Sequence, residues 1–478
     1  MKRTLLTYLP IIAASILAAA LTACHSSKVG EEFTGSSGAA EGATVDLTLD
    51  MYFLGSDYTR AEAVLPAEQI NSLRVVIVDL GIDSQGNPVA EPAVERNDLF
   101  EHVSLTTGSD VGLPTGVARL QFPKIRADRR KKIYLIANAE PAKQSYLQLQ
   151  LPDGTQLNSL SIDNNHLFVP DSNGSADIDD ATFVSPKGSY TNNDIPANEE
   201  LSVPMTAVHT IAIPTIAELT ERYPSINNSI TYTLPGKLYV VRAVNKISFE
   251  FRNMTCSDED EQDGIELLVR EWSISEINNG GSYLFGHPGD NGNLYADKKT
   301  DYYYNVNAPW MQWLYDEAER SLSSFYTPAW LTDYELPSNA QSGEYTFRPG
   351  NYTGSADQGS PSDSDGYLLP APATTAGTTL STEKRPVYFG ESHSGNPQQY
   401  ELTFTVWQRT KQQPAWNNPY TYRATSTADV SGSFNLKSLF RNTHVVVTVT
   451  FRTGRGRINA EVDVHPYGSY ELEPDFGL

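Results

Sequence analysis

Apolar residues occupy every second position between residues 45 and 53 of this chain. These positions are Val45, Leu47, Leu49, Met51 and Phe53. Successive side chains of a β-strand point to opposite faces, so the alternation predicts a strand with one buried face. The pattern returns near the other end of the chain, at Ile458, Ala460, Val462 and Val464 and then at Tyr470, Leu472, Phe476 and Leu478. Pro474 stands within the last of these segments.

Much of the chain between these segments also has strand-like patterns. Leu73–Asp79 and Lys132–Ala137 are short apolar runs that predict buried strands. Tyr239–Phe251 is too long for one flat strand, so we expect it to bend or to change sheets. Pro309–Ser323 is the one convincing helical pattern. Short strands, many turns and few helices predict an all-β fold of β-sandwiches with a few short helices.

The length of the chain and the positions of its tryptophans suggest two domains. At roughly 150 residues per domain, a chain of 478 residues corresponds to two or three domains. All six tryptophans follow the proline-containing stretch Tyr223–Pro235, which suggests two domains with different cores. We therefore expect one domain over residues 61–236 and another over residues 237–478.

Composition argues against several classes of function. The formal net charge is −23, whereas a nucleic-acid partner requires a concentrated positive field. Two cysteines are too few for a disulfide scaffold or a cysteine-rich metal site. The sequence Gly390–Ser394 differs from a nucleophile elbow because its fifth residue is serine rather than glycine. We expect no enzymatic activity, no cofactor, no bound metal and no nucleic-acid partner.

Two charged segments each allow two interpretations. The basic run Lys124–Lys132 suits either an anion-binding patch or a solvated entry into a strand. Charged runs usually form solvated faces, so we favour the second. The acidic positions between Asp171 and Asp179 suit either a solvated loop or a calcium site, although the spacing of an EF-hand is missing.

The first residues have the features of an export signal. Lys2 and Arg3 precede an apolar stretch, and small residues then lead to Cys24. This arrangement predicts a secretory signal over residues 1–23, and its end resembles the processing site of bacterial lipoproteins, where Cys24 receives lipid. The alternative is ordinary signal cleavage with no role for Cys24. A lipidated Cys24 would hold the protein at a membrane through its acyl chains.

The terminal strands suggest a route to assembly. Strands at chain termini usually lie at sheet edges, where unpaired N–H and C=O groups can pair with another chain. Release of the strand at residues 45–53 would expose an apolar groove, and a segment with the same alternation from a neighbouring copy would fit it. Such head-to-tail contacts build filaments. The alternative is that both terminal segments pair within their own domains and the protein stays monomeric.

The aromatic residues between Tyr302 and Trp330 suggest another class of function. Their flat faces would suit stacking on sugars, in a monomeric glycan-binding surface lipoprotein. The same residues on a helix and its flanks would also form a core, which we favour. A secreted hydrolase would need a polar catalytic cluster that the sequence does not identify, although 58 acidic residues leave paired carboxylates open.

Several weak patterns follow one another in a specific order across nearly the whole chain. They are the lipoprotein site at Cys24, Ile70–Asp79, Lys132–Asn138, Arg242–Phe249, Tyr283–Gly286 and Arg441–His444. In this order they resemble the fimbrillins, the lipoprotein-derived subunits of type V pili in Bacteroidetes. The resemblance implies two tandem transthyretin-like β-sandwich domains in a cell-surface fimbrium that supports adhesion.

The resemblance also implies how subunits join. In fimbrillins an arginine-specific or trypsin-like protease removes the segment through the first strand, and C-terminal strands of the adjoining subunit replace it. Here the cut would fall between Arg60 and Ala61, and the donor strands would lie within residues 458–478. The lipidated precursor would reside at the outer membrane, and its partners would be other pilus subunits and an adhesion ligand. Pro474 has no N–H for a strand ladder, so we expect the last segment to pair only in part. The segment Gly350–Thr382 is longer than a minimal stalk subunit needs, which leaves tip and anchor roles open.

Overall fold

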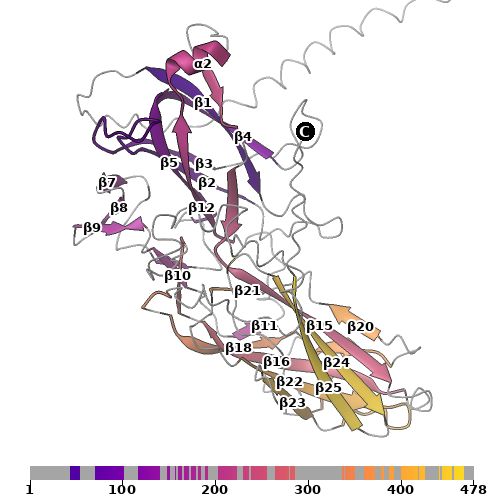
Figure 1. Ribbon diagram of the computed structural model, residues 1–478. Coiled ribbons are helices and arrows are strands. Elements are labelled where there is room, and N and C mark those ends of the chain that lie inside the picture. The colour runs from indigo at the N-terminus through magenta and orange to yellow at the C-terminus, as the bar shows by residue number, and fades with distance from the viewer. Residues whose placement is uncertain are drawn as a thin grey trace, which may run out of the picture.

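The computed structural model describes two lobes built of β-sheets, which lie end to end (Figure 1). The described residues are 43–53, 70–101, 117–139, 148–150, 157, 160–163, 166–171, 174–178, 181–184, 189–191, 203–222, 230–235, 238–255, 264–278, 280–285, 336–338, 340–349, 360–371, 378–381, 387–391, 400–417, 419–425, 441, 444–454 and 457–467. Over these residues the protein is an all-β sandwich protein, as the sequence predicts. No helix among them is both long and apolar enough to span a membrane.

The first lobe contains eight strands in one curled sheet. In spatial order they are β4 (Val117–Arg126), β1 (Thr44–Phe53), β13 (Thr231–Thr233) with β14 (Leu238–Arg242), β12 (Met205–Ile213), β5 (Arg129–Ala137), β2 (Leu73–Asp79) and β3 (Ala93–Phe100). The sheet curls until its end strands meet, and the rings of Phe100 on β3 and Phe122 on β4 lie 6.1 Å apart, edge to face. The lobe therefore has two layers with its apolar side chains inside.

The core of the first lobe follows from the apolar patterns of its strands. All seven residues of β2 are buried, including the polar Arg74 and Asp79. On β1, the side chains of Val45, Leu47, Leu49 and Met51 are at most 1% exposed. The predicted strand and its buried face are thus confirmed. The backbone of Phe53 closes β1, and its side chain lies outside the described part of the chain.

The lobes are joined where a long apolar run changes sheets. After β14, Ala243 and Val244 turn the chain, and β15 (Asn245–Thr255) enters the second lobe. The expected change of sheet within Tyr239–Phe251 is therefore confirmed. Both β13 and β14 pair with β1. This pairing keeps the chain in the first lobe as far as residue 242, past the expected division at residue 236.

Two small sheets accompany the lobes. One contains β6 (Gln148–Gln150), β10 (Thr182–Val184) and β17 (Gly281–Tyr283). The other contains β7 (Ser161–Asp163), β8 (His166–Asp171) and β9 (Gly174–Asp177). Directly after β17, the Leu284 N–H donates to the Ala181 carbonyl at 2.7 Å. This contact and the β10–β17 pairing tie the second half of the chain to the first.

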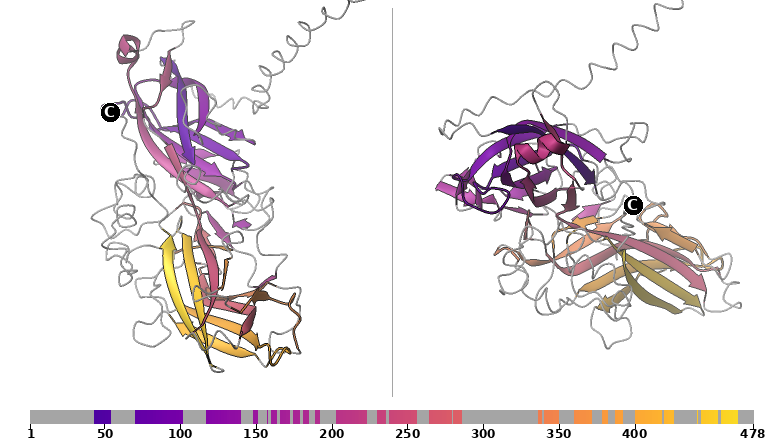
Figure 2. Two further views of the ribbon diagram at one scale, coloured as in Figure 1. Left: turned by 90° about the vertical axis from the view of Figure 1, so that its right-hand side faces the viewer. Right: turned by 45° about the horizontal axis from the view of Figure 1, so that its top comes forward.

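The second lobe is a sandwich of two sheets. The first sheet contains β11 (Ser189–Thr191), β18 (Ser342–Arg348), β16 (Glu266–Asn278), β22 (Glu401–Arg409) and β23 (Tyr420–Thr425), with β19 (Tyr367–Leu369) also paired to β16. The second contains β20 (Thr378–Ser381), β15, β24 (His444–Gly454) and β25 (Arg457–Tyr467), with β21 (Val387–Phe389) also paired to β15. Figure 2 shows β24 and β25 side by side, in yellow, along one face of this lobe.

Aromatic side chains fill the space between these two sheets. Phe249 and Phe251 on β15 face Trp272 on β16, with ring centroids 5.3 Å and 5.1 Å away. Phe347 on β18 stacks on Trp272 at 5.4 Å. Such pairs stabilise a core beyond the effect of buried area alone. The second lobe therefore has an aromatic core, whereas aliphatic residues dominate the buried strands of the first.

The described residues include one helix, α2 (Ile216–Arg222). Thr215 caps it: the Thr215 hydroxyl accepts from the Glu218 N–H at 3.3 Å, and the Glu218 carboxylate accepts from the Thr215 N–H at 2.9 Å. This reciprocal pair is a capping box. The Thr215 N–H and the Thr215 hydroxyl both donate to the Glu218 carboxylate, and these two hydrogen bonds lower the pKa of Glu218. The expected helix at Pro309–Ser323 and the aromatic segment between Tyr302 and Trp330 lie outside the described residues.

Candidate functional site

The backbone of β1 is paired along both of its sides. On one side it runs antiparallel to β4, from Thr44 opposite Arg126 to Tyr52 opposite Val117. On the other side it runs parallel to β13 and then to β14. The expectation that this strand is an edge element is therefore wrong. Segments almost two hundred residues further along the chain cover the side that would otherwise be open.

Removal of β1 would leave a long slot in the first lobe. Its floor would be the core that now covers Val45, Leu47, Leu49 and Met51, and its walls would be the unpaired backbone edges of β4 and of β13 with β14. We call this region the β1 slot. Only an extended segment with alternating apolar side chains can satisfy both walls and the floor at once.

Two polar side chains of β1 mark positions along the β4 wall. The Asp50 carboxylate accepts two hydrogen bonds from Arg119, from Nε and Nη2, each at 2.7 Å. At the other end, Asp46 Oδ1 accepts from the Lys124 N–H at 3.3 Å. Planar two-point contacts between arginine and a carboxylate have strict geometry. The β4 wall therefore favours an inserted strand that places a carboxylate opposite Arg119 and a hydrogen-bond acceptor opposite the Lys124 N–H.

The Lys124 contact depends on an irregularity in β4. Opposite the β1 segment from Val45 to Leu47, β4 has one residue more than β1, and this extra residue makes a β-bulge. Lys124 lies in the bulge with a φ of 58°, in the left-handed region. Pro123 precedes it and offers no N–H, which sheets tolerate at bulges. The bulge turns the Lys124 N–H toward β1.

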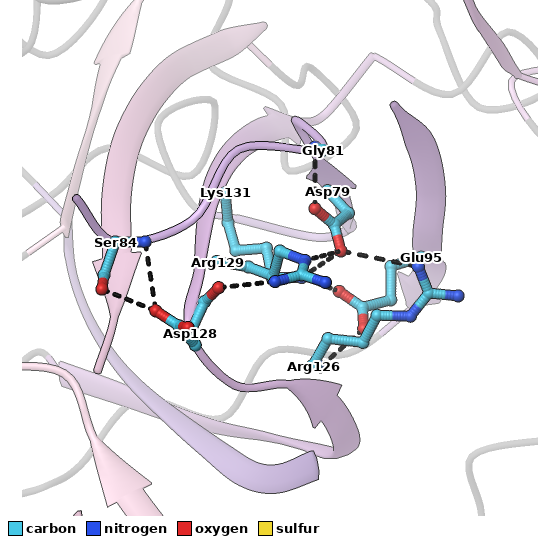
Figure 3. A network of polar contacts seen from close by, with 8 residues as sticks. All are labelled: Asp79, Gly81, Ser84, Glu95, Arg126, Asp128, Arg129 and Lys131. Atoms are coloured by element: carbon cyan, nitrogen blue, oxygen red, sulfur yellow. Dashed lines mark hydrogen bonds and ion pairs between the residues drawn. The ribbon is translucent and has the colours of Figure 1, made fainter. Parts of the chain in front are cut away.

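A network of buried charges lies where β4 turns into β5, beside the first residues of β1 (Figure 3). Lys131 Nζ lies 2.9 Å from Asp79 Oδ2 and 2.7 Å from Glu95 Oε2. The Arg126 and Arg129 side chains lie 3.7 Å and 3.8 Å from the same Asp79 oxygen. The backbone N–H of Gly81 donates to the other oxygen of Asp79 at 2.9 Å.

The favoured interpretation of Lys124–Lys132 as a solvated strand entry is wrong for the residues that face this network. Lys131 has no exposed surface, whereas its neighbour Arg130 is exposed. The strand alternation puts these two side chains on opposite faces. The partners of Lys131 come from β2 and β3, which the basic run itself does not predict. The network holds the C-terminal end of β4 in place. Directly after this end, the Ala127 N–H donates to the Ala43 carbonyl beside the start of β1, at 2.9 Å.

The predicted donor segment Ile458–Val464 lies within β25. It pairs antiparallel with β24 from Arg457 opposite Gly454 to Tyr467 opposite His444. Among the described strands, β25 is the outermost of its sheet, in the order β20, β15, β24, β25. The donor segment thus has the edge position expected of a terminal strand, and it is paired within its own chain. It lies in the second lobe, and β1 lies in the first (Figures 1 and 2).

A buried arginine holds the chain just before this hairpin. Arg441 has no exposed surface, and its Nη2 lies 2.7 Å from Glu391 Oε2. Arg441 also donates to the carbonyls of Tyr283 and Leu284, at 2.8 Å and 3.0 Å. Thr206 of β12 donates to the same Leu284 carbonyl at 2.9 Å. The base of the hairpin is therefore attached to the end of β17, the strand that ties the second half of the chain to the first through β10.

The sequence predicted β1 and a strand at Ile458–Val464, but it did not predict Arg119 or the roles of Lys124, Glu391 and Arg441. Lys124 was noted only as the start of the basic run, and Arg441 only as part of one of the ordered motifs. The residues predicted for lipidation and processing, Cys24, Arg60 and Ala61, and those predicted for the second donor segment, Tyr470, Leu472 and Phe476, lie outside the described residues. Within the described part of the chain, no three His, Cys, Asp or Glu side chains gather as a metal site would require.

Comparisons with known proteins give structural similarities and no sequence match. No protein-family model matches the chain, and no curated protein matches it. The fimbrilin FimA of Porphyromonas gingivalis aligns with a TM-score of 0.37 at 11% identity, over 89% of this chain and 97% of that one. The tip fimbrial protein Mfa3 of the same species aligns with a TM-score of 0.34 at 11% identity, over 89% of this chain and 100% of that one.

Both of these structures are fimbrial proteins of Bacteroidetes, the class that the sequence resembles. Both TM-scores lie below 0.5, which is too low for an argument from these structures to the function of this chain. The functional proposal therefore depends on the strand arrangement and the sequence of this chain.

Proposed function

We propose that this protein is a structural subunit of a cell-surface fimbrium, and that subunits join by exchange of strands. One observation carries the proposal. The first of the described strands, β1, is an interior strand with backbone partners on both sides, and its four described apolar side chains are at most 1% exposed. It is also followed at once by the segment that contains Arg60, so one cut would separate it from the rest of the lobe.

The energetics favour replacement of β1 over simple loss. Burial of its four aliphatic side chains contributes roughly 6–12 kcal/mol, at about 1.5–3 kcal/mol each. This is comparable with the net stability of a whole domain, about 5–15 kcal/mol. The empty slot would also expose two rows of backbone hydrogen-bonding groups. A lobe that loses β1 after processing therefore needs another strand in its place.

The donor in this proposal is the C-terminal part of a neighbouring copy. Its first segment is Ile458–Val464, with Tyr470, Leu472 and Phe476 as a second segment. The slot belongs to the first lobe and β25 to the second, so insertion links the second lobe of one copy to the first lobe of the next. A contact between two different surfaces of identical molecules extends into a filament when the rotation between neighbours does not close a ring, and the proposal is such an open filament.

The surrounding steps of the proposal are supported by the export signal at the start of the sequence and by the resemblance to the fimbrillins. Residues 1–23 direct export, lipid on Cys24 holds the precursor at the outer membrane, and an arginine-specific or trypsin-like protease cuts between Arg60 and Ala61. The sequence around Arg60 predicts an exposed loop, and such loops suit proteolysis. The released lobe then accepts a donor strand, and the finished fimbrium supports adhesion to a host or bacterial surface. No catalytic step by this chain is part of the proposal.

The test uses the full chain, exported without lipid and treated with an arginine-specific protease. We expect N-terminal sequencing to find Ala61 and electron microscopy to find filaments. A double substitution of Val462 and Val464 by Asp should abolish filaments, because charges would enter the floor of the slot. The matched control, N459D with E461D, changes the opposite face of the same segment and should still assemble.

Four outcomes would redirect the proposal. A cleaved protein that stays monomeric, or filaments that survive V462D with V464D, would overturn strand exchange through this segment. Surface protein that retains its N-terminal strand would indicate an anchor subunit. A monomer whose tryptophan fluorescence responds to polysaccharides would instead support a glycan-binding lipoprotein.

A further inference from the structure

We propose that Arg119 sets the register of the incoming donor strand by pairing with Asp463 of the neighbouring copy. This inference rests on the proposed strand exchange and adds which residues meet. Arg119 belongs to β4, so it stays in the lobe when β1 leaves. In the unprocessed chain it holds Asp50 by two hydrogen bonds of 2.7 Å each.

The two strands carry the same order of apolar and polar residues. Val45–Met51 has the sequence VDLTLDM, and Ile458–Val464 has the sequence INAEVDV. When Ile458 takes the place of Val45, every apolar residue falls on the floor of the slot. Asp463 then stands in the place of Asp50, within reach of the guanidinium fork of Arg119, which fits a carboxylate at two points.

The second marker of the β4 wall agrees with this register. Asn459 takes the place of Asp46, whose Oδ1 accepts from the N–H of Lys124. The amide oxygen of an asparagine is also a hydrogen-bond acceptor. Both polar contacts that β1 makes with β4 through its acidic side chains therefore have a counterpart in the donor.

Other registers of the same segment fit less well. A shift by one residue would turn the apolar side chains away from the floor. A shift by two in one direction puts Arg457 at the Lys124 N–H, where an acceptor is required. A shift by two in the other direction puts His465 opposite Arg119 and Pro466 in the place of Met51. Proline has no N–H for the ladder.

The second alternating segment cannot occupy the β1 slot without a proline in it. Any register that keeps its apolar residues on the floor and spans Val45–Met51 places Pro474 at Leu47 or at Leu49. Both of these β1 residues lie opposite β4 residues, Phe122 and Leu120. The inference therefore assigns the slot to Ile458–Val464 and leaves Tyr470–Leu478 for contacts outside it.

Disulfide trapping in the full chain reads the register directly. Thr48 of β1 lies opposite Gln121 of β4, and in the proposed register Glu461 takes the place of Thr48. With Cys256 replaced by Ser, the pair Q121C and E461C should give disulfide-linked ladders on a non-reducing gel after treatment with the protease. The pairs Q121C with N459C and Q121C with D463C report the two shifted registers and should give none.

Charge reversal tests Arg119 itself. We expect R119E and D463R each to slow filament growth several-fold, and the double variant R119E with D463R to recover it. Because R119E also meets Asp50 in the unprocessed chain, the variants that contain R119E also carry D50R, which restores that pair before cleavage and leaves with β1, whereas the D463R single variant keeps Asp50. R119E with D50R but without D463R should therefore be processed normally and assemble poorly.

The outcomes separate this inference from the proposed function. Filaments that cross-link through Q121C and N459C, or that grow equally well with R119E alone, would overturn the register and leave strand exchange standing. A processed wild-type chain that forms no filaments, together with cysteine variants that form no cross-link in any of the three pairs, would overturn the proposed function itself. Ladders from Q121C with E461C, together with charge-swap recovery, would support both.

Discussion

The Lys131 ammonium group lies 2.9 Å from the Asp79 carboxylate, and both side chains are buried, at 0% and 1% exposure. Glu95 approaches the same ammonium group at 2.7 Å. This buried ammonium group compensates the charge of both carboxylates at hydrogen-bond distance, whereas Arg126 and Arg129 lie further from Asp79, at 3.7 Å and 3.8 Å. The network in Figure 3 therefore stabilises the fold at the end of the β1 slot.

The first prediction concerns this network. K131M keeps the side-chain length, removes the charge and should lower the free energy of unfolding by about 3–5 kcal/mol. The control is R130M, on the exposed face of the same strand, which should change it by less than about 0.5 kcal/mol. Urea denaturation of the full chain measures both. Equal effects would contradict the assigned burial of Lys131.

A second prediction separates the precursor from the assembled protein. L47A should destabilise the unprocessed first lobe by about 2–5 kcal/mol, because it leaves a cavity in the core. It should leave filaments unchanged, since β1 is absent from them under the proposed function. The control L120A, on β4, should weaken both forms. Thermal denaturation of the precursor and of the filaments measures both effects. L47A filaments that denature at a lower temperature than wild-type filaments would count against the loss of β1.

A third prediction concerns the base of the terminal hairpin. E391Q should lower the free energy of unfolding by about 3–5 kcal/mol, because it leaves the buried Arg441 without its carboxylate. The double variant E391Q with R441M removes the charge on both sides and should recover part of the loss. A thermodynamic cycle over the two single variants and the double variant measures the coupling. Additive losses would show that the two side chains act independently.

A fourth prediction tests a tight turn beside the charge network. Gly81 has a φ of 68°, and a Cβ on it would lie 2.0 Å from the carbonyl oxygen of Ala90. G81A should therefore cost more than about 3 kcal/mol, the upper range for a strained φ alone. Gly86 has a φ of 100°, but the nearest atom to its Cβ would be 3.4 Å away, at the flexible end of Arg130. G86A should cost clearly less in the same urea titration.

A fifth prediction concerns pH. Hydrogen bonds from Arg409, helped by Trp416, hold the pKa of Asp363 below its ordinary value of 3.8. A carboxylate with a lowered pKa in the folded state stabilises that state above the ordinary pKa, and the contribution is lost as the pH falls through the lowered value. R409Q should raise the pKa of Asp363 in an NMR titration, whereas K411Q on the nearby exposed loop should not. An unchanged pKa in R409Q would exclude this cause.

Local patterns predicted a large part of this architecture. The alternation at Val45–Met51 and the apolar runs at β2 and β5 predicted strands, and those strands are present. The long run Tyr239–Phe251 predicted a change of sheet, which occurs at Ala243 and Val244. These features depend on periods of two residues and on run length, so neighbouring residues are enough to reveal them.

Features that depend on distant partners were not predictable. The basic run looked like a solvated strand entry because Asp79 and Glu95, which bury Lys131, lie dozens of residues earlier in the chain. Arg119 carried no signal either, since an arginine on an exposed strand face is ordinary. Its significance comes from the register that places it opposite Asp50.

The sequence by itself determined that residues 45–53 and 458–464 alternate and that each can form a strand with one apolar face. Only the tertiary structure decided their places, with β1 between two partners inside its sheet and β25 at the edge of another. The reason is that the side-chain period is a property of consecutive residues, whereas backbone pairing depends on which distant segments fold beside a strand. The parallel pairing of β1 with β13 and β14 provides that information, and from it follows the slot that a second copy would fill.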